Sequence, residues 1–378
     1  MKKIMCVFGT RPEAIKMAPI VKRLMNDQRV KCFTCVTAQH REMLDQVLAL
    51  FDIRPAVDLN LMQSNQTLAQ ITSSVLEHLD PVIKEYKPDW ILAQGDTTTV
   101  MATALLAYYH RIYFGHVEAG LRTYDKFQPF PEEINRRVAG VIADLHFAPT
   151  EWSRANLLHE GVSTQNIVVT GNPVIDALQW TASLPFDFSS TRKLGLDLQG
   201  LEKNQKKIIL VTAHRRENFG VPLENICEAI LGLANLYRDE VHFIYPVHLN
   251  PNVQEPVNRL LANHPHITLT PPMDYLPLIN VLKRSKLVLT DSGGLQEEAP
   301  GLGIPVLVLR EVTERPEGVE AGTVQLVGTN PSEIIRSVSL LLNDSKEYDR
   351  MTKAINPYGD GHSSERIVEA VVNFDPNK

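Results

Sequence analysis

The sequence has few cysteines and no long apolar run. Four of its 378 residues are cysteine, too few for a disulfide framework in a chain of this length. We therefore expect a reducing, cytoplasmic environment. The apolar segment 4–8 ends at Gly9 and is too short for a secretory signal, and no apolar run is long enough to span a bilayer. We expect neither a secretory leader nor a membrane span.

A block of basic residues is absent as well. Lys and Arg total 38 against 44 Asp and Glu, a formal net charge of −6, so we expect no nucleic-acid partner, because phosphate backbones are bound by clustered cations. The P-loop, the dinucleotide-binding glycine pattern, the G-x-S-x-G elbow and the common zinc motifs are also missing. Cys32 and Cys35 match C-x-x-C, but this spacing within a strand directs the thiols to opposite faces. We expect no metal and no bound cofactor.

Apolar stretches of strand length alternate with helix-period segments along the whole chain, which is typical of parallel α/β architecture. A helical pattern at 67–85 is expected to be interrupted at Pro81. The predicted strands are 4–8, 32–37, 90–94, 113–117, 146–148 and 167–170 in the first half, and 208–212, 241–246, 267–269, 287–290, 306–309 and 324–327 in the second.

The length of 378 residues exceeds the size at which a single core usually stops growing, so we expect more than one domain. The prediction is a Rossmann-like domain at 1–171, a second at 172–362, and a C-terminal helix at 363–378 that packs back on the first. The polar segment 184–205 is the expected crossing region. Two such domains predict a ligand site in a central cleft.

One strand-to-helix junction predicts a phosphate site. The apolar run 287–290 leads into Ser292-Gly293-Gly294 and then into a segment able to form a helix. Glycines let backbone amides approach a ligand, and the unpaired N–H groups of a helix start favour a diphosphate. An ordinary strand-to-helix turn is the alternative interpretation.

Further polar clusters follow the predicted strands, at the edge where open α/β sheets bind ligands. Singly, each has an ordinary structural role, since Asp96 can cap a helix and acidic residues favour a helix start. Together, carboxylates from separate loops can supply an acid and a base, and Arg or His side chains can bind an anion. The candidates are Arg11, Lys16, Asp96, His116, Glu118, Glu132, His214, Arg215, His248 and Arg315.

Six motifs follow one another along the chain. They are Phe8–Ala14 (FGTRPEA), Thr37–Arg41 (TAQHR), Gly95–Thr98 (GDTT), His116–Arg122 (HVEAGLR), Thr212–Arg216 (TAHRR) and Asp291–Glu298 (DSGGLQEE). In this order they resemble one known family, the non-hydrolysing bacterial UDP-N-acetylglucosamine 2-epimerases. The resemblance extends from Phe8 to about Gly361.

The resemblance implies a GT-B-like pair of Rossmann-type domains, a homodimer, and interconversion of UDP-N-acetylglucosamine and UDP-N-acetylmannosamine for cell-envelope or capsule polysaccharide. In the implied reaction, UDP is eliminated to give a 2-acetamidoglucal and then adds back. The residues carried over by motif form three groups. They are Asp96, Glu118, Glu132 and His214 for catalysis; Arg11, Lys16, Ser292, Gly293, Gly294, Glu298 and Arg315 for UDP and substrate; and Gln39, Glu42, Arg215 and His248 for a second, regulatory UDP-N-acetylglucosamine.

Three rival functions share features with this interpretation. A GT-B glycosyltransferase has the same architecture, a hydrolysing 2-epimerase would release N-acetylmannosamine and UDP, and a nucleotide-sugar sensor would bind without reaction. The sequence also leaves open which carboxylate acts as acid and which as base.

Overall fold

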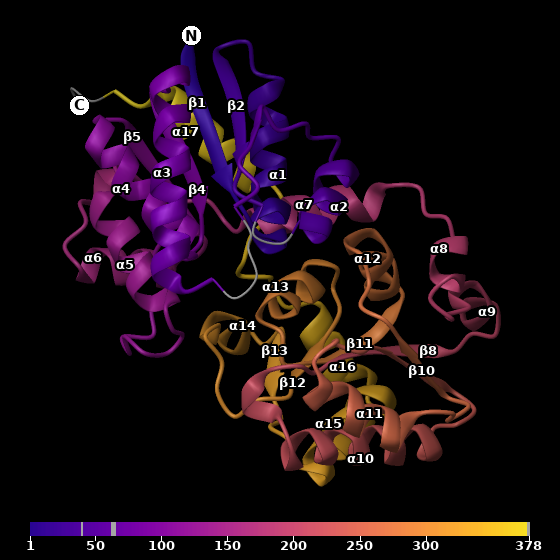
Figure 1. Cartoon of the computed structure of the whole chain (residues 1–378). Coiled ribbons are helices and arrows are strands. Elements are labelled where there is room, and N and C mark those ends of the chain that lie inside the picture. Colours follow the sequence, from indigo (N-terminus) through magenta and orange to yellow (C-terminus); the bar gives the residue numbers. More distant parts are fainter. Residues whose placement is uncertain (39–40, 62–65, 376–378) are drawn as a thin grey trace. The chain divides into compact units, whose positions relative to one another are not determined.

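The computed structural model describes residues 1–38, 41–61 and 66–375, and it divides into two compact units (Figure 1). Unit 1 comprises Met1–Ala177 together with Tyr358–Lys378, and unit 2 comprises Leu178–Pro357. The chain passes from the first unit to the second within helix α7 (Pro173–Ser183). Each unit is built on its own sheet.

Unit 1 contains a seven-stranded sheet in the order β3-β2-β1-β4-β5-β6-β7, in which each neighbouring pair is parallel over the described residues. Its strands are β1 Lys2–Phe8, β2 Val30–Val36, β3 Val57–Asp58, β4 Trp90–Gln94, β5 Tyr113–Val117, β6 Leu145–Ala148 and β7 Ile167–Val169. Its helices are α1 Arg11–Met25, α2 Arg41–Leu50, α3 Leu68–Tyr86, α4 Thr98–His110, α5 Glu132–Ile142, α6 Glu151–His159, the first part of α7, and α17 Ser363–Asn373, with a 3-10 turn at Thr164–Asn166.

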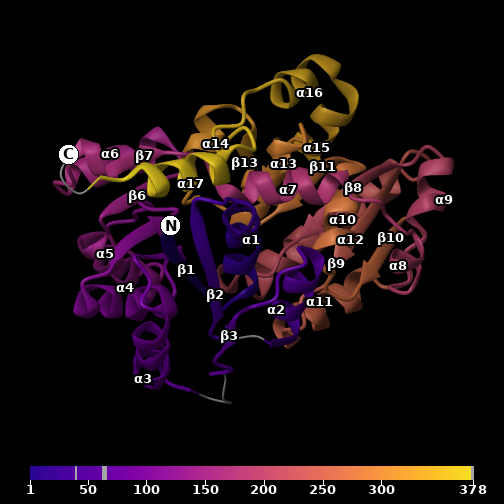
Figure 2. The ribbon, with the colours of Figure 1, turned by 90° about the horizontal axis from the view of Figure 1, so that it is seen from above.

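Helices cover both faces of this sheet, which explains why its central strands are continuous apolar runs. Side chains of α3, α4 and α5 pack with Met5 and Val7 of β1 in one core cluster. Helix α17 packs on α1, and Figure 2 shows the two helices side by side. The Lys2 ammonium donates to the carbonyls of Val371, Val372 and Phe374. These contacts place the C-terminal helix within unit 1.

Unit 2 contains a six-stranded sheet in the order β10-β9-β8-β11-β12-β13, and these pairs are parallel as well. Its strands are β8 Lys207–Thr212, β9 Val241–Pro246, β10 Ile267–Thr270, β11 Ser285–Thr290, β12 Val306–Val308 and β13 Val324–Leu326. Its helices are α8 Ser189–Arg192, α9 Leu198–Lys203, α10 Val221–Leu236, α11 Pro251–Leu261, α12 Tyr275–Lys283, α13 Gly293–Gly301, α14 Pro316–Glu320, α15 Pro331–Asn343 and α16 Ser345–Thr352, with a 3-10 turn at Arg216–Asn218.

The strand order reverses at one point in each sheet, and ligands of open α/β sheets bind outside the carboxyl ends of the strands there. In unit 1 the reversal lies between β1 and β4, and in unit 2 between β8 and β11. The loops that leave these strands carry most of the polar motifs. The predicted fold class is confirmed, with two parallel α/β sheets of Rossmann type.

Several local predictions need correction. Helix α3 continues through Pro81, because Val75, Leu79 and Ile83 bury one face of the helix and offset the hydrogen bond that the proline cannot donate. Strand β3 was not expected, since two residues are too short for an alternating pattern. No helix was predicted in the polar segment 184–205, but it contains two short helices, α8 and α9. The side chain of Asp197 caps α9 by accepting from the Gly200 amide. Among the described residues, no helix is both long and apolar enough to cross a bilayer.

Candidate functional site

The turn after β1 is held by a buried carboxylate. Thr10 caps α1 by accepting from the Glu13 amide, and the Glu13 carboxylate accepts from the amides of Gly9 and Thr10 at 2.9 and 2.7 Å. The other Glu13 oxygen accepts from the Thr97 hydroxyl at 2.6 Å, which ties this turn to the loop after β4. Burial raises the pKa of Glu13. This network presents Arg11 and Lys16 on the first turns of α1.

Asp96 lies in the loop after β4, paired with a cation. Its carboxylate accepts from the Arg136 guanidinium at 2.6 Å, and its backbone carbonyl accepts from the Asn135 side chain at 2.9 Å. Burial raises the pKa of Asp96 above its ordinary value; the Arg136 charge opposes this shift and the Glu118 charge adds to it. Asp96 is therefore a carboxyl group that binds a proton more readily than an aspartate in water.

Glu118 follows β5 and is surrounded by donors. Lys16 donates to it at 2.5 Å and the Asn172 amide at 2.7 Å, both to Oε1, while Gln94 donates to Oε2. The residue is buried and has a left-handed backbone, with φ of 62°. Hydrogen bonds from donors and a nearby ammonium favour the ionised form of a carboxylate. Unit 1 therefore holds two neighbouring carboxyl groups in different environments.

Two adjacent glutamates at the start of α5 have different surroundings. Glu133 is fully buried, accepts from the amides of Thr123 and Tyr124 at 3.1 and 3.2 Å, and pairs with Arg136 at 3.4 Å. Glu132 is partly exposed at the first position of the helix. Glu133 thus holds the loop after β5 in place, whereas the side chain of Glu132 is reachable from solvent.

In unit 2, Asp291 organises the loop after β8. One oxygen of its fully buried carboxylate accepts from the amides of His214 and Arg215 at 2.7 and 2.8 Å and from the Asn218 side chain at 3.0 Å. The His214 ring lies 3.4 Å from the other oxygen and stacks on His248, with ring centroids 5.4 Å apart. Burial lowers the pKa of His214, and the Asp291 charge opposes that shift. His214 is therefore a partly exposed, oriented imidazole.

The Ser292-Gly293-Gly294 turn leads directly into α13, as predicted. Ser292 stands before the first helical residue and makes no side-chain cap. A Cβ on Gly293 would lie 2.7 Å from the Arg315 guanidinium, so the absence of a side chain lets Arg315 lie against the helix start. Arg315 donates to Glu297 at 2.5 Å, and Glu298 accepts from the Tyr275 hydroxyl at 2.8 Å. The helix N-terminus and a guanidinium are thus adjacent, an arrangement suited to a diphosphate.

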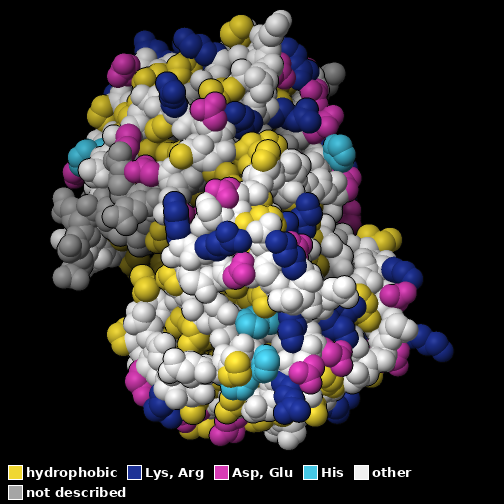
Figure 3. All heavy atoms as spheres, turned by 90° about the vertical axis from the view of Figure 1, so that its right-hand side faces the viewer, with side chains coloured by type: hydrophobic (Ala, Val, Ile, Leu, Met, Phe, Trp, Pro, Cys, Tyr) yellow, Lys and Arg dark blue, Asp and Glu magenta, His cyan; other side chains and the backbone are white. Residues whose placement is uncertain are grey.

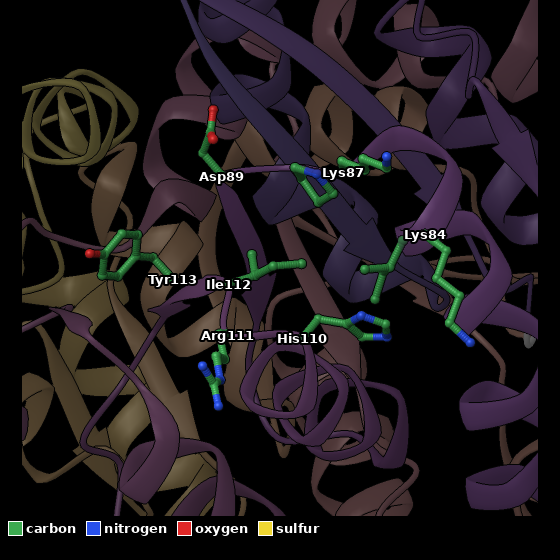
Figure 4. Close-up of a pocket in the computed structure, with 9 residues that line it drawn as sticks. Lys84, Lys87, Asp89, His110, Arg111, Ile112 and Tyr113 are labelled. Carbon is green, nitrogen blue, oxygen red and sulfur yellow. The ribbon is translucent and has the colours of Figure 1, made fainter.

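A pocket of about 560 Å³ lies away from these loops, near the C-terminal ends of α3 and α4 (Figure 4). Two of its lining residues, Lys84 and His110, contact the carboxylate of Asp80, at 2.5 and 2.7 Å. The labelled Arg111 and Tyr113 side chains point in other directions. Its polar groups therefore do not converge on one ligand position, and the pocket contains none of the predicted site residues.

Charge is mixed on one face of the molecule, and the described residues include no cluster suited to a metal ion. On the face in Figure 3, basic and acidic side chains are interspersed. No three His, Cys, Asp or Glu residues in the described ranges are arranged to hold a metal ion.

The structure brings some predicted residues into contact and leaves others apart. Lys16, Asp96 and Glu118 form one cluster with Arg136, while Arg11 and Glu132 stand at the starts of their helices. In unit 2, His214 with His248 and Gly293 with Arg315 are in contact. Gln39 lies outside the described residues, and only the backbone of Glu42 is described, within α2.

Several polar residues in these clusters were not singled out from the sequence. They are Glu13, Gln94, Asn172, Asp291 and Glu297, each of which contacts a predicted site residue or its loop. A sequence signal existed for one of them, because Thr10 and Glu13 form a capping box. The others depend on contacts between distant segments, which no local pattern reveals.

The architecture and the two polar clusters define a GT-B-like α/β protein with two Rossmann-type units. The family model described as UDP-N-acetylglucosamine 2-epimerase matches residues 22–372. The UDP-N-acetylglucosamine 2-epimerase of Escherichia coli K12 is 53% identical over 372 residues, covering 98% of both chains. The chain belongs to the UDP-N-acetylglucosamine 2-epimerase family.

Solved structures agree with this assignment. The UDP-GlcNAc 2-epimerase of Neisseria meningitidis, crystallised with UDP-GlcNAc, is 47% identical with a TM-score of 0.91, covering 98% of this chain and 100% of its own. The S. aureus MnaA co-structure with UDP is 49% identical with a TM-score of 0.87, covering 98% of this chain and 96% of its own.

Proposed function

We propose that the protein interconverts UDP-N-acetylglucosamine and UDP-N-acetylmannosamine without releasing a free sugar. The observation that carries the proposal is the pair of neighbouring carboxyl groups in opposite environments. Glu118 accepts from three donors, whereas the pKa of Asp96 is raised by burial. Such a pair can remove a proton from one face of a sugar carbon and return a proton to the other face. The names and bound ligands of the relatives support this choice of substrate.

Elimination is the step that makes this epimerisation chemically accessible. The hydrogen on carbon 2 is hardly acidic, because no adjacent carbonyl stabilises a carbanion. If a carboxylate takes that proton while the C1–O bond to UDP breaks, the C–H electron pair forms the C1–C2 double bond of a 2-acetamidoglucal. The UDP oxygen then adds back to carbon 1 as a proton reaches carbon 2 from the opposite face. Asp96, Glu118 and Glu132 are the proposed proton-transfer groups.

The leaving group requires a separate set of cations and amides. We assign the diphosphate to Arg11, Arg315 and the Ser292-Gly293-Gly294 amides, with Glu298 as acceptor for ribose hydroxyls. Lys16 belongs to the substrate set. His214 can stabilise or protonate the departing diphosphate. The support is the contact between Arg315 and the start of α13, since preorganised donors stabilise charge that develops during reaction.

A second UDP-N-acetylglucosamine is proposed as an activator, contacting Gln39, Glu42, Arg215 and His248. The stacking of His248 on His214 supports a link between this group and the leaving-group residues. Initial rates that are sigmoidal in UDP-N-acetylglucosamine are expected. Hyperbolic rates, together with no effect of this sugar on the reverse reaction, would argue against the second site.

We also propose a cytoplasmic homodimer that supplies cell-envelope or capsule polysaccharide. Size-exclusion chromatography and light scattering test the dimer.

The reaction in heavy water tests the proposal directly. We expect deuterium at carbon 2 of both UDP-sugars and no steady accumulation of free UDP, measured by NMR. Accumulating UDP with free N-acetylmannosamine would identify a hydrolase, and binding without exchange would identify a sensor.

The variant Asp96→Asn separates chemistry from binding. We expect a loss of turnover of at least about a hundredfold, because a proton-transfer group is removed, with UDP affinity by calorimetry little changed. Lost UDP affinity would contradict a purely chemical role for Asp96.

A further inference from the structure

Asn172 links Glu118 to a distant part of the chain. It stands between β7 and α7, is buried, and donates from its side-chain amide to Glu118 at 2.7 Å. Its side-chain oxygen accepts from the Val174 amide at 3.1 Å, which caps the start of α7. One side chain thus fixes a helix start and contacts a site carboxylate.

The segment before α17 holds this turn in place. The backbone amide of Asn172 donates to the Tyr358 carbonyl at 2.7 Å. The preceding residue, Gly171, has a left-handed φ of +81°. A Cβ on Gly171 would lie 2.7 Å from the Ser363 hydroxyl and 3.1 Å from the Gly359 Cα, so the two segments pack at backbone distance.

One carboxylate on α7 completes the attachment. Asp176 accepts from the amides of Ser363 and Ser364 at 3.1 and 2.8 Å and from the Ser364 hydroxyl at 2.6 Å. These contacts all lie within unit 1. They join the C-terminal segment to the turn that carries Asn172.

We propose that Asn172 is a positioning residue for Glu118, and that the segment Tyr358–Ser364 holds Asn172 in the position from which it donates. This inference rests on the proposed function, because it assigns Glu118 a part in the reaction. It adds to that function a role for a residue and a C-terminal segment that do not contact the substrate in the assignment above.

The chemical reason is the fixed direction of the Asn172 amide. Its oxygen is engaged by Val174, so its NH₂ group faces Glu118 and can only donate. A donor at this point stabilises the carboxylate and restricts its rotation. The charged and titratable groups near Glu118 include Lys16 on α1, Asp96 after β4, His116 on β5 and, beside Asp96, Arg136 on α5.

The variant Asn172→Asp distinguishes positioning from helix capping. Aspartate caps a helix as well as asparagine does and has nearly the same shape, so a purely structural role predicts unchanged activity. The positioning role predicts a loss in kcat of about tenfold to a hundredfold near neutral pH, because two carboxylates then face each other. The KM and the UDP affinity should change little.

The pH dependence gives the decisive readout. At lower pH the carboxyl pair shares one proton, and a protonated Asp side chain can donate to Glu118 as the amide did. The ratio of variant to wild-type kcat is therefore expected to rise as the pH falls from about 8 to about 5. A ratio near one, or a reduced ratio that does not change with pH, would overturn the inference.

A second measurement does not depend on turnover. The shared proton raises the pair's folded-state affinity for protons, so the stability of Asn172→Asp relative to wild type should fall as pH rises. A difference in Tm that is constant with pH would contradict the carboxyl contact. Val75→Ala, in the apolar core of the same unit, is the control; it should lower Tm without altering the pH profile.

Asp176→Asn tests the role of the C-terminal segment. Loss of a charged acceptor for Ser363 and Ser364 should lower kcat severalfold with KM unchanged, and Ser364→Ala, which removes only the hydroxyl contact, should have a smaller effect. Unchanged kcat in Asp176→Asn would remove the segment from the proposal. Failure of the proposed function would appear differently, as wild-type protein without deuterium exchange.

Discussion

At the scale of single residues, acidic side chains with the same charge have different tasks. Glu13 and Glu133 accept from backbone amides and hold the loops after β1 and β5. Glu118 accepts from three side chains, and Asp96 is paired with a guanidinium. We assign loop stabilisation to the first pair of carboxylates and propose proton transfer for the second pair.

Gly120, which lies two positions after Glu118, and Gly161 make a matched test of backbone geometry. Gly120 has φ of +92°, and a Cβ there would lie 2.2 Å from the Ser153 carbonyl oxygen. Gly161 has φ of +86° with open space around it. We expect Gly161→Ala to cost about 1 kcal/mol from the left-handed conformation alone, and Gly120→Ala to cost about 3 kcal/mol or more, because backbone must move. Urea unfolding of both variants measures the difference.

Equal losses in the two variants would mean that the backbone around Ser153 adjusts without cost. A reduced kcat is also expected for Gly120→Ala, since the residue lies two positions after Glu118, and Gly161→Ala should retain full activity.

At the scale of elements, the adjacent strands β5 and β6 carry two buried histidines. His116 and His146 are register partners, and the His116 ring lies 2.7 Å from the Gly95 carbonyl, next to Asp96. Burial lowers the pKa of His116 to about 4 and that of His146 to about 3. The strand pair that presents Glu118 therefore depends on neutral imidazoles.

Acid should destabilise this strand pair. In the unfolded chain these histidines bind protons below the ordinary histidine pKa of about 6.5, whereas in the folded chain His116, with a pKa of about 4, binds one only near that pH. The free energy of unfolding is therefore highest above about pH 6.5. It falls as the pH decreases, by about 1.4 kcal/mol per pH unit for each histidine. His146→Gln should reduce this slope in urea unfolding measured between those limits.

The control for this experiment is His78→Gln, because His78 is exposed on α3. It should leave the slope unchanged. Equal slopes in wild type and His146→Gln would contradict the assignment of the acid sensitivity to the buried pair.

At the scale of the whole molecule, the two units repeat one topology and carry different chemistry. In each sheet, loops with polar motifs leave the two strands between which the strand order reverses. Carboxylates dominate the loops of unit 1, whereas unit 2 offers a helix start with an arginine and an oriented histidine. We assign proton transfer to unit 1 and the binding of UDP mainly to unit 2.

Thermal stabilisation by UDP tests this division. A ligand present at about 100 times its Kd stabilises the folded state by about 2.7 kcal/mol, and a tenfold weaker Kd removes about 1.4 kcal/mol of that gain. We expect Arg315→Gln to reduce the rise in Tm caused by UDP, and Asp96→Asn to retain it. Calorimetric melting of each variant with and without UDP provides the measurement. If Asp96→Asn instead loses the UDP-induced rise in Tm and Arg315→Gln keeps it, UDP is bound mainly by unit 1.

Local patterns in the sequence were sufficient for the fold class and for the loops that carry polar residues. Strand length, apolar continuity and glycine turns are properties of short segments, so the alternation of strands and helices and the junction before α13 could be predicted directly. Helix α3 shows the limit of this approach, because packing of its buried face outweighs the effect of Pro81.

The sequence by itself determined two α/β sheets, the residues available for chemistry, and a resemblance that named the family. Only the tertiary structure decided which of those residues meet. Glu118 receives donors from Lys16, Gln94 and Asn172, which are separated from it by up to 102 positions in the chain. The C-terminal segment reaches Asp176 over 188 positions. Burial and hydrogen bonding between distant segments give each carboxylate its environment, and no local pattern encodes them.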